Sequence, residues 1–125
     1  MDWNNVTLGN LSVKAIHMGN IKIWPQNIFT VEPTSIDVDS SSHYEEIVVT
    51  SVYGGAAASV NVSVLNDDIG LGGLGYTDGP NLGERIYYVQ IPYNITYEDR
   101  EATIRFTQPS SGLYIDVDIW QEMYM

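Results

Sequence analysis

The chain of 125 residues contains no cysteine, few cations and no long apolar run. Without cysteine, disulfides and thiolate metal sites are excluded, so the stability of the fold must come from the burial of apolar side chains. No stretch approaches the roughly 20 apolar residues that a membrane-spanning helix needs. The start of the sequence, MDWNNVTLGN, has neither a basic region nor an apolar run of signal-peptide length, so we expect no secretion signal.

Positive charge is scarce, because five Lys and Arg stand against sixteen Asp and Glu and give a formal net charge of −11. A field of this sign repels the phosphates of nucleic acids and anionic lipid headgroups. We therefore expect neither a nucleic-acid partner nor a membrane partner. The length suits one domain with an appended element, and a hydrophobic fraction of 44% is typical of a folded protein.

Helical periodicity is also missing, since no window shows a convincing apolar repeat at 3.6 residues. Alternating Val, Ile, Tyr and Thr, bounded by Gly, Asn, Asp, Ser and Pro, predict an all-β protein. Residues 1–25 contain LGNLSV and MGNIKI, whose Gly-Asn pairs predict two tight turns of a three-stranded β-meander that ends at Pro25. We predict that this meander is a docking element.

Residues 28–125 form the second predicted unit, an immunoglobulin-like β-sandwich of seven strands. In the last strand, Tyr114, Asp116 and Asp118 are expected on the solvent face, opposite Val117 and Ile119. The seven candidate strands are residues 28–33, 35–39, 45–52, 56–65, 85–93, 101–108 and 113–122.

A glycine-rich stretch, NDDIGLGGLGYTDGPNLGE at residues 66–84, is predicted as a long loop that interrupts the sandwich. Such a loop is either mobile or shaped by a partner. Gly70, Gly72 and Gly75 have the spacing of a dinucleotide-binding turn, which must lead into a helix. The residues that follow break helices, so we expect no nucleotide and no other cofactor.

Two segments of the second unit carry a family resemblance: VEPTSIDVDSSSHYEEIVVTS, and IPYNITYEDREATIRFTQ followed by IDVDIWQE. Over residues 28–124 the chain resembles the BACON domain, an immunoglobulin-like sandwich frequent in Bacteroidetes proteins and in their phages. Family positions are matched by Asn94, Arg100, Ala102, Thr103, Ile104 and Gln121.

The residues around Asn94 have a physical interpretation as well. Asn94 can bond the local backbone, and Arg100 can reach acidic neighbours or loop carbonyls, so we expect both to determine the fold. The chain departs from the family in its middle strands, which commonly carry a tryptophan. Here Tyr53 and a run of alanines stand instead, so a candidate stacking platform for sugars is missing.

The meander at residues 1–25 resembles short N-terminal β-meanders in structural proteins of tailed phages. Together the two units are similar to virion structural proteins of crAss-like or related Bacteroides phages. The resemblance implies a non-enzymatic virion protein, assembled in the host bacterial cytoplasm, that docks on capsid, tail or fibre proteins and forms a homo-oligomer. The candidate docking residues are Trp3, Leu8, Leu11, Ile16, Met18, Ile21, Ile23 and Trp24.

Catalytic and metal-binding patterns are weak. His17 and His43 are the two histidines, and no nucleophile-elbow motif accompanies them, so we predict that the chain is not an enzyme. Alternating carboxylates could bind Ca²⁺ if two pairs adjoined, and the alternative is a solvated sheet face. These carboxylates are Asp37, Asp39, Asp116 and Asp118.

Aromatic residues suggest an alternative function. Tyr53 and Tyr76 could stack on sugars, which would make the chain a carbohydrate-binding module for host-surface or mucin glycans. Tyr76 and Trp3 have no predicted strand around them, so contact with a partner is favoured there at least as much as a core position. Trp24 and Trp120 each close an alternating strand and are expected in the core.

Overall fold

The computed structural model describes residues 26–124, which form β-strands joined by turns and loops and, over this range, no helix. The meander and docking residues predicted within residues 1–25 lie outside the described residues, Trp24 included. The strands are β2 (Ile28–Glu32), β3 (Ser35–Val38), β4 (His43–Tyr53), β5 (Ala56–Ala57), β6 (Asn61–Asp67), β7 (Gly72–Asp78), β8 (Glu84–Ile91), β9 (Arg100–Gln108) and β10 (Leu113–Gln121).

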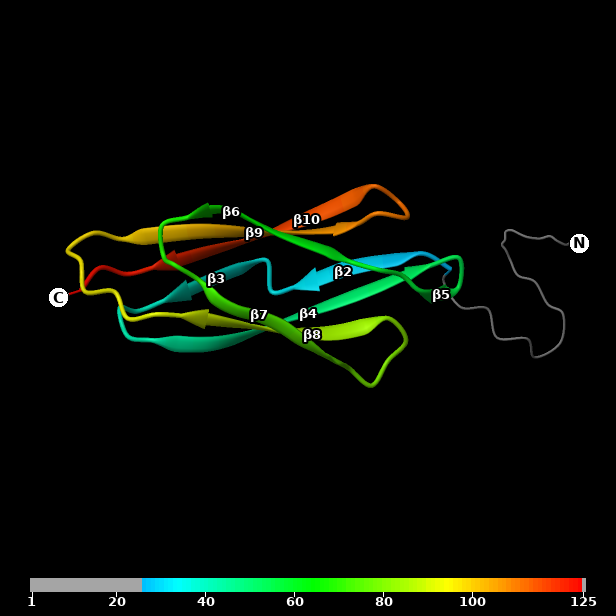
Figure 1. Ribbon diagram of the computed structural model, residues 1–125, viewed down its shortest axis with the longest axis horizontal. Helices are drawn as coiled ribbons and strands as arrows, with labels where there is room; N and C mark the ends of the chain where they lie inside the picture. Colours follow the sequence, from blue (N-terminus) through cyan, green and yellow to red (C-terminus); the bar gives the residue numbers. More distant parts are fainter. Residues whose placement is uncertain (1–25, 125) are drawn as a thin grey trace, which may run out of the picture.

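The strands form two sheets, with the orders β2-β4-β8-β7 and β3-β10-β9-β6, and the short β5 pairs with the end of β4. β2 and β3 are consecutive but belong to different sheets, because the chain crosses between them after the cis Glu32–Pro33 bond. β3 pairs with β10 in parallel, whereas the other strand pairs are antiparallel. The two sheets form an immunoglobulin-like sandwich, which is the predicted fold class (Figure 1).

The core lies between the two sheets, where alternate residues of each strand point inward. Phe106 of β9 is fully buried and meets the ring of Tyr87 edge-on, with centroids 5.1 Å apart. In β10, Val117 and Ile119 are buried whereas Asp118 is exposed, so the predicted alternation is confirmed. Full burial of each large aliphatic side chain stabilises the fold by about 1.5–3 kcal/mol.

The glycine-rich stretch is not a long loop, so that prediction was wrong. β6 extends to Asp67, and β7 pairs with β8 with a register shift between Gly73 and Gly75. Gly73 has a φ of 87°, and an added Cβ would lie 2.9 Å from the carbonyl oxygen of Tyr88. Backbone hydrogen bonding to β8 thus builds a strand where glycine alone permits the close approach.

The prediction of a core position for Trp120 was also wrong. Its side chain is 37% exposed, because its neighbours Ile119 and Gln121 take the inward positions of β10. The alternation of β10 was therefore predicted correctly, but its tryptophan belongs to the exposed set of residues and not to the buried set.

The two ends of the elongated sandwich differ in what closes them (Figure 1). At one end, which we call the hairpin end, the amide of Gly55 donates a hydrogen bond to the carbonyl oxygen of Gln26 over 3.0 Å. The opposite end, which we call the loop end, consists of the β3–β4 turn, the loop at residues 92–99 and residues 122–124. β4 runs between them, and at about 3.3 Å per residue its eleven residues separate the ends by about 33 Å.

Candidate functional site

The loop at residues 92–99 joins β8 to β9 and is fixed by a fully buried asparagine, Asn94. Its side-chain amide donates to the carbonyl oxygens of Glu98 and Glu122 over 2.9 and 3.1 Å. Its side-chain oxygen accepts from the amide and the hydroxyl of Thr96, over 2.9 and 2.6 Å. Asn94 thus supplies hydrogen-bond partners to backbone groups of a segment that has no sheet partner, which confirms its predicted role in the fold.

Arg100 and the buried Gln121 hold the first residues of the same loop. The Arg100 guanidinium donates to the Gln121 side-chain oxygen over 2.7 Å and to the Pro92 carbonyl oxygen over 3.2 Å. The Gln121 amide also donates to that carbonyl, over 2.9 Å. Arg100 therefore reaches loop carbonyls, as predicted, and its charge strengthens these hydrogen bonds.

Exposed aromatic and apolar side chains gather on this scaffold. The ring of Tyr124 lies 5.9 Å from that of Tyr93 and 6.0 Å from that of Tyr97, centroid to centroid. Tyr97 is 75% exposed and Ile95 is 72% exposed. We call this surface the end patch; its members are Tyr93, Ile95, Tyr97, Met123 and Tyr124. Exposed apolar groups of this kind are typical of sites that contact another molecule.

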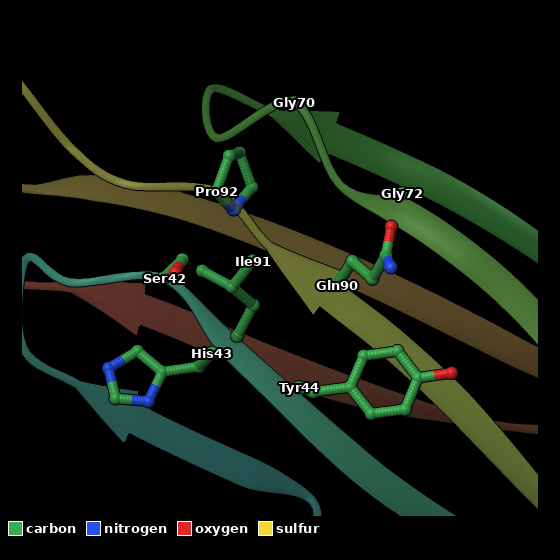
Figure 2. Close-up of a pocket in the computed structure, with 8 residues that line it drawn as sticks. All are labelled: Ser42, His43, Tyr44, Gly70, Gly72, Gln90, Ile91 and Pro92. Atoms are coloured by element: carbon green, nitrogen blue, oxygen red, sulfur yellow. The ribbon is translucent and has the colours of Figure 1, made fainter.

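An open pocket of about 450 Å³ lies on the face of the β4-β8-β7 sheet, next to the loop end (Figure 2). One cross-strand row, made of Tyr44, Gln90 and Gly72, contributes to its lining. Gly72 has no side chain, and a Cβ there would lie 3.3 Å from the side-chain oxygen of Gln90. The remaining lining residues are Ser42, His43, Gly70, Ile91 and Pro92.

Tyr44 is the most exposed aromatic residue of the pocket, with 61% of its surface accessible. Its ring stacks on Tyr88 at a centroid distance of 5.7 Å and an interplanar angle of 18°. The hydroxyl of Tyr88 lies 3.1 Å from that of Thr77 on β7. We call Tyr44, Tyr88 and Gln90 the tyrosine face.

His43 belongs to a polar cluster in the β3–β4 turn. Its Nε2 atom lies 2.7 Å from the Asp39 carboxylate and 3.2 Å from the Ser41 hydroxyl. Hydrogen bonds from the Ser41 hydroxyl, then the His43 ring and the Ser41 amide, lower the pKa of Asp39 to about 2. In a catalytic triad, the acid and the serine bond to different ring nitrogens. Here one nitrogen faces both, so the arrangement suits a turn-stabilising cluster and not an activated serine.

Three of the four carboxylates considered for calcium have separate hydrogen-bond partners. Asp116 accepts two hydrogen bonds from Arg105, at 2.8 and 3.0 Å, and these lower its pKa. Asp118 accepts from the hydroxyl of Thr103 over 3.1 Å. Asp39 belongs to the turn cluster, and Asp37 is exposed on β3. Over residues 26–124 no group of three or more His, Asp or Glu is arranged to hold a metal ion.

The two tyrosines proposed from the sequence for glycan contact do not come together. Tyr76 lies on β7 against Tyr87, and the Arg85 guanidinium lies 4.7 Å from its ring centroid. Across β8, Tyr87 pairs with Ile47, which is six residues before Tyr53 on β4. Tyr53 therefore belongs to the hairpin end, and the tyrosine face was missed. The alternation in HYEEIVV, which places Tyr44 beside Glu46 on the polar face, could have revealed it.

Comparisons with known proteins give only remote structural likenesses. No family model matches the chain, and no curated protein matches its sequence. An NMR structure of a protein from Bacteroides thetaiotaomicron has 12% identity, with 87% of this chain and 97% of that one covered and a TM-score of 0.46. WR4, an MSP family member of C. elegans, has 9% identity, coverages of 78% and 99%, and a TM-score of 0.38. In the part of the chain that is described, no helix is long and apolar enough to cross a membrane.

Proposed function

We propose that this chain is a non-enzymatic structural protein of a virion that acts by docking to other proteins. The observation that carries the proposal is the end patch, which exposes aromatic and apolar groups on a loop held by Asn94, Arg100 and Gln121. A pre-ordered loop loses little entropy on binding, and tyrosine is enriched at the energetic centres of protein interfaces.

The virion setting comes from the sequence resemblance to BACON-like modules behind a short meander. It implies capsid, tail or fibre partners and assembly in the bacterial cytoplasm, with residues 1–25 as a second docking element. The geometry of the Asp39, Ser41 and His43 cluster supports a structural role for the turn beside the end patch.

Incorporation into particles tests this function. We expect that deletion of residues 1–25, or the pair Ile95→Ser and Tyr97→Ser, reduces the amount of the protein in purified particles, measured by mass spectrometry. Leu82→Ser is the matched control, because Leu82 is 60% exposed but lies between β7 and β8, outside the end patch. Unchanged incorporation of both altered proteins would contradict the proposal.

Carbohydrate binding is the second candidate function, and the tyrosine face favours it. The exposed Tyr44 ring borders a pocket in which the Gln90 amide and the Ser42 hydroxyl are available for hydrogen bonds to sugar hydroxyls. A glycan array tests this: signals lost in Tyr44→Ala and kept in Tyr53→Ala would support a glycan site. Silence of the wild-type protein across bacterial and mucin glycans would leave protein docking as the better account.

A further inference from the structure

The end patch carries negative charge around its apolar surface. Glu98 and Asp99 are exposed in the loop, and Glu122 follows β10. Among residues 26–124, Arg100 is the only Lys or Arg of the loop end, and its guanidinium is bonded to Gln121 and to loop carbonyls. The surface that remains for a partner is therefore apolar with an anionic rim. Two such patches placed face to face would repel each other.

The sequence contains one segment of complementary chemistry. Residues 1–25 hold both lysines of the chain, Lys14 and Lys22, and only one of its sixteen acidic residues, Asp2. The same segment holds the apolar residues predicted to dock, such as Ile21 and Trp24. The three arginines of residues 26–124 already have partners within the sandwich. Arg85 lies over the ring of Tyr76, and Arg100 donates to Gln121. Arg105 donates to Asp116.

Residues 1–25 join the described sandwich at Gln26, at the end opposite to the end patch. Gln26 is held at the hairpin end by the amide of Gly55, and the side chain of Asn27 accepts from the amide of Gly54 over 3.0 Å. The end patch lies at the other end of β4, about 33 Å away. The described chain therefore begins at one end of the sandwich, and β10 leads into the end patch at the other (Figure 1).

We propose that copies of this chain associate head to tail, with residues 1–25 of one copy bound to the end patch of the next. This inference rests on the proposed docking function and names the partner of the end patch. Because the contact joins two different surfaces, repeated contacts build a ring or a filament. The carboxylates of the rim, Glu98 foremost, would face Lys14 and Lys22 of the neighbouring copy.

Sedimentation velocity of the full chain over a range of concentrations tests the inference. We expect oligomers that grow with concentration and weaken at high salt, because Coulomb attraction between exposed groups is screened. A segment variant (Lys14→Glu with Lys22→Glu) and a rim variant (Glu98→Lys with Glu122→Lys) should each associate about tenfold or more weakly. Circular dichroism establishes that both variants are folded, and Leu82→Ser should associate like the wild type.

Mixing the two charge variants is the decisive measurement. In the mixture, the acidic segment of one variant meets the basic rim of the other, and the unaltered lysines meet the unaltered carboxylates. We therefore expect association to return with the two variants in equal amounts. A mixture that stays monomeric although the wild type associates would overturn the proposal.

Other outcomes also overturn it. A wild-type chain that is monomeric at all concentrations contradicts head-to-tail contact. Association lost in Tyr97→Ser but kept in the segment variant would mean that patches pair symmetrically. A segment variant that lowers the melting temperature of a monomer would place the segment on its own sandwich. If incorporation into particles still depends on Ile95 and Tyr97 in these cases, the docking function stands and only the partner assigned here is wrong.

Discussion

The two ends of the sandwich are each closed by a buried glutamine, and the two glutamines have different partners. At the hairpin end, the Gln108 amide donates to the hydroxyl of Ser51 over 3.0 Å and to the carbonyl oxygen of Ile28 over 3.1 Å. At the loop end, Gln121 donates to carbonyls and also accepts from the Arg100 guanidinium. One end is closed by neutral hydrogen bonds and the other by charge-assisted ones.

The difference follows from what each glutamine supports. Ile28 and Ser51 belong to paired strands, β2 and β4, whose ladder holds most of their backbone. Residues 92–99 have no ladder, so the side chains of Asn94, Arg100 and Gln121 replace it. A loop held by side chains can expose aromatic groups without losing its shape, and it depends more strongly on the identity of each supporting residue.

Replacing each glutamine by leucine measures how strongly each end of the sandwich depends on its buried glutamine. We expect Gln121→Leu to lower the free energy of unfolding by about 3 kcal/mol, because it leaves the half-buried Arg100 without its closest acceptor. Gln108→Leu should cost about 1.5 kcal/mol, since its partners are neutral. Urea denaturation measures both values. Equal losses of unfolding free energy would show that the charge of Arg100 adds nothing to the stability of the loop end.

Asn94→Ala should have the next largest effect, a loss of about 2 kcal/mol. The alanine removes the acceptor of the Thr96 amide and the donor to the carbonyl oxygens of Glu98 and Glu122, of which Glu98 keeps a hydrogen bond from the Thr96 hydroxyl. Asn61→Ala is the control, because Asn61 is exposed at the start of β6 and surface substitutions usually change stability by less than about 0.5 kcal/mol. Similar losses in the two variants, measured by thermal unfolding, would argue against a special role for Asn94.

Thr96→Val tests the same network with a side chain of similar shape. It removes the hydroxyl that donates to Asn94 and keeps the backbone amide bond, so we expect a loss of about 1 kcal/mol. Hydrogen exchange of amides in residues 94–98 should speed up, whereas amides of β4 at the hairpin end should not change. Faster exchange at both ends would mean that the loop end is not an independent unit.

Ser41→Ala should have the smallest effect on stability and a clear effect on titration. Its hydroxyl is the main cause of the lowered pKa of Asp39, so that pKa should rise from about 2 toward 3.8. Since the folded pKa is depressed, the stability that Asp39 contributes is present above about pH 4 and is lost as the pH falls toward 2. An NMR titration of the Asp39 carboxyl measures the shift, with Asp116 as an internal control. An unchanged pKa of Asp39 in this variant would show that the Ser41 hydroxyl does not lower it.

Particular residues show how far the sequence alone could lead. Residues 101–108 were correctly predicted as a strand, and the alternation in residues 113–122 predicted both the strand and its buried face, because period-two patterning is local. The glycine-rich residues of β7 have no such pattern, and their strand exists because β8 offers a free edge. Asn94 and Arg100 were recognised as structural, yet the exposed Tyr97, Ile95 and Tyr124 were not predicted to form one surface, since they come from two chain segments.

The β class, the inward positions of the last strand and the excess of negative charge could be predicted from the sequence, since each depends on residue type and short-range spacing. Contacts between side chains of distant segments depend instead on the tertiary structure. It placed the row of Tyr44, Gln90 and Gly72 around a pocket and brought Tyr93, Tyr97 and Tyr124 to one end. The physical reason is that strand register and loop closure are set by the packing of the whole core, which no local pattern encodes.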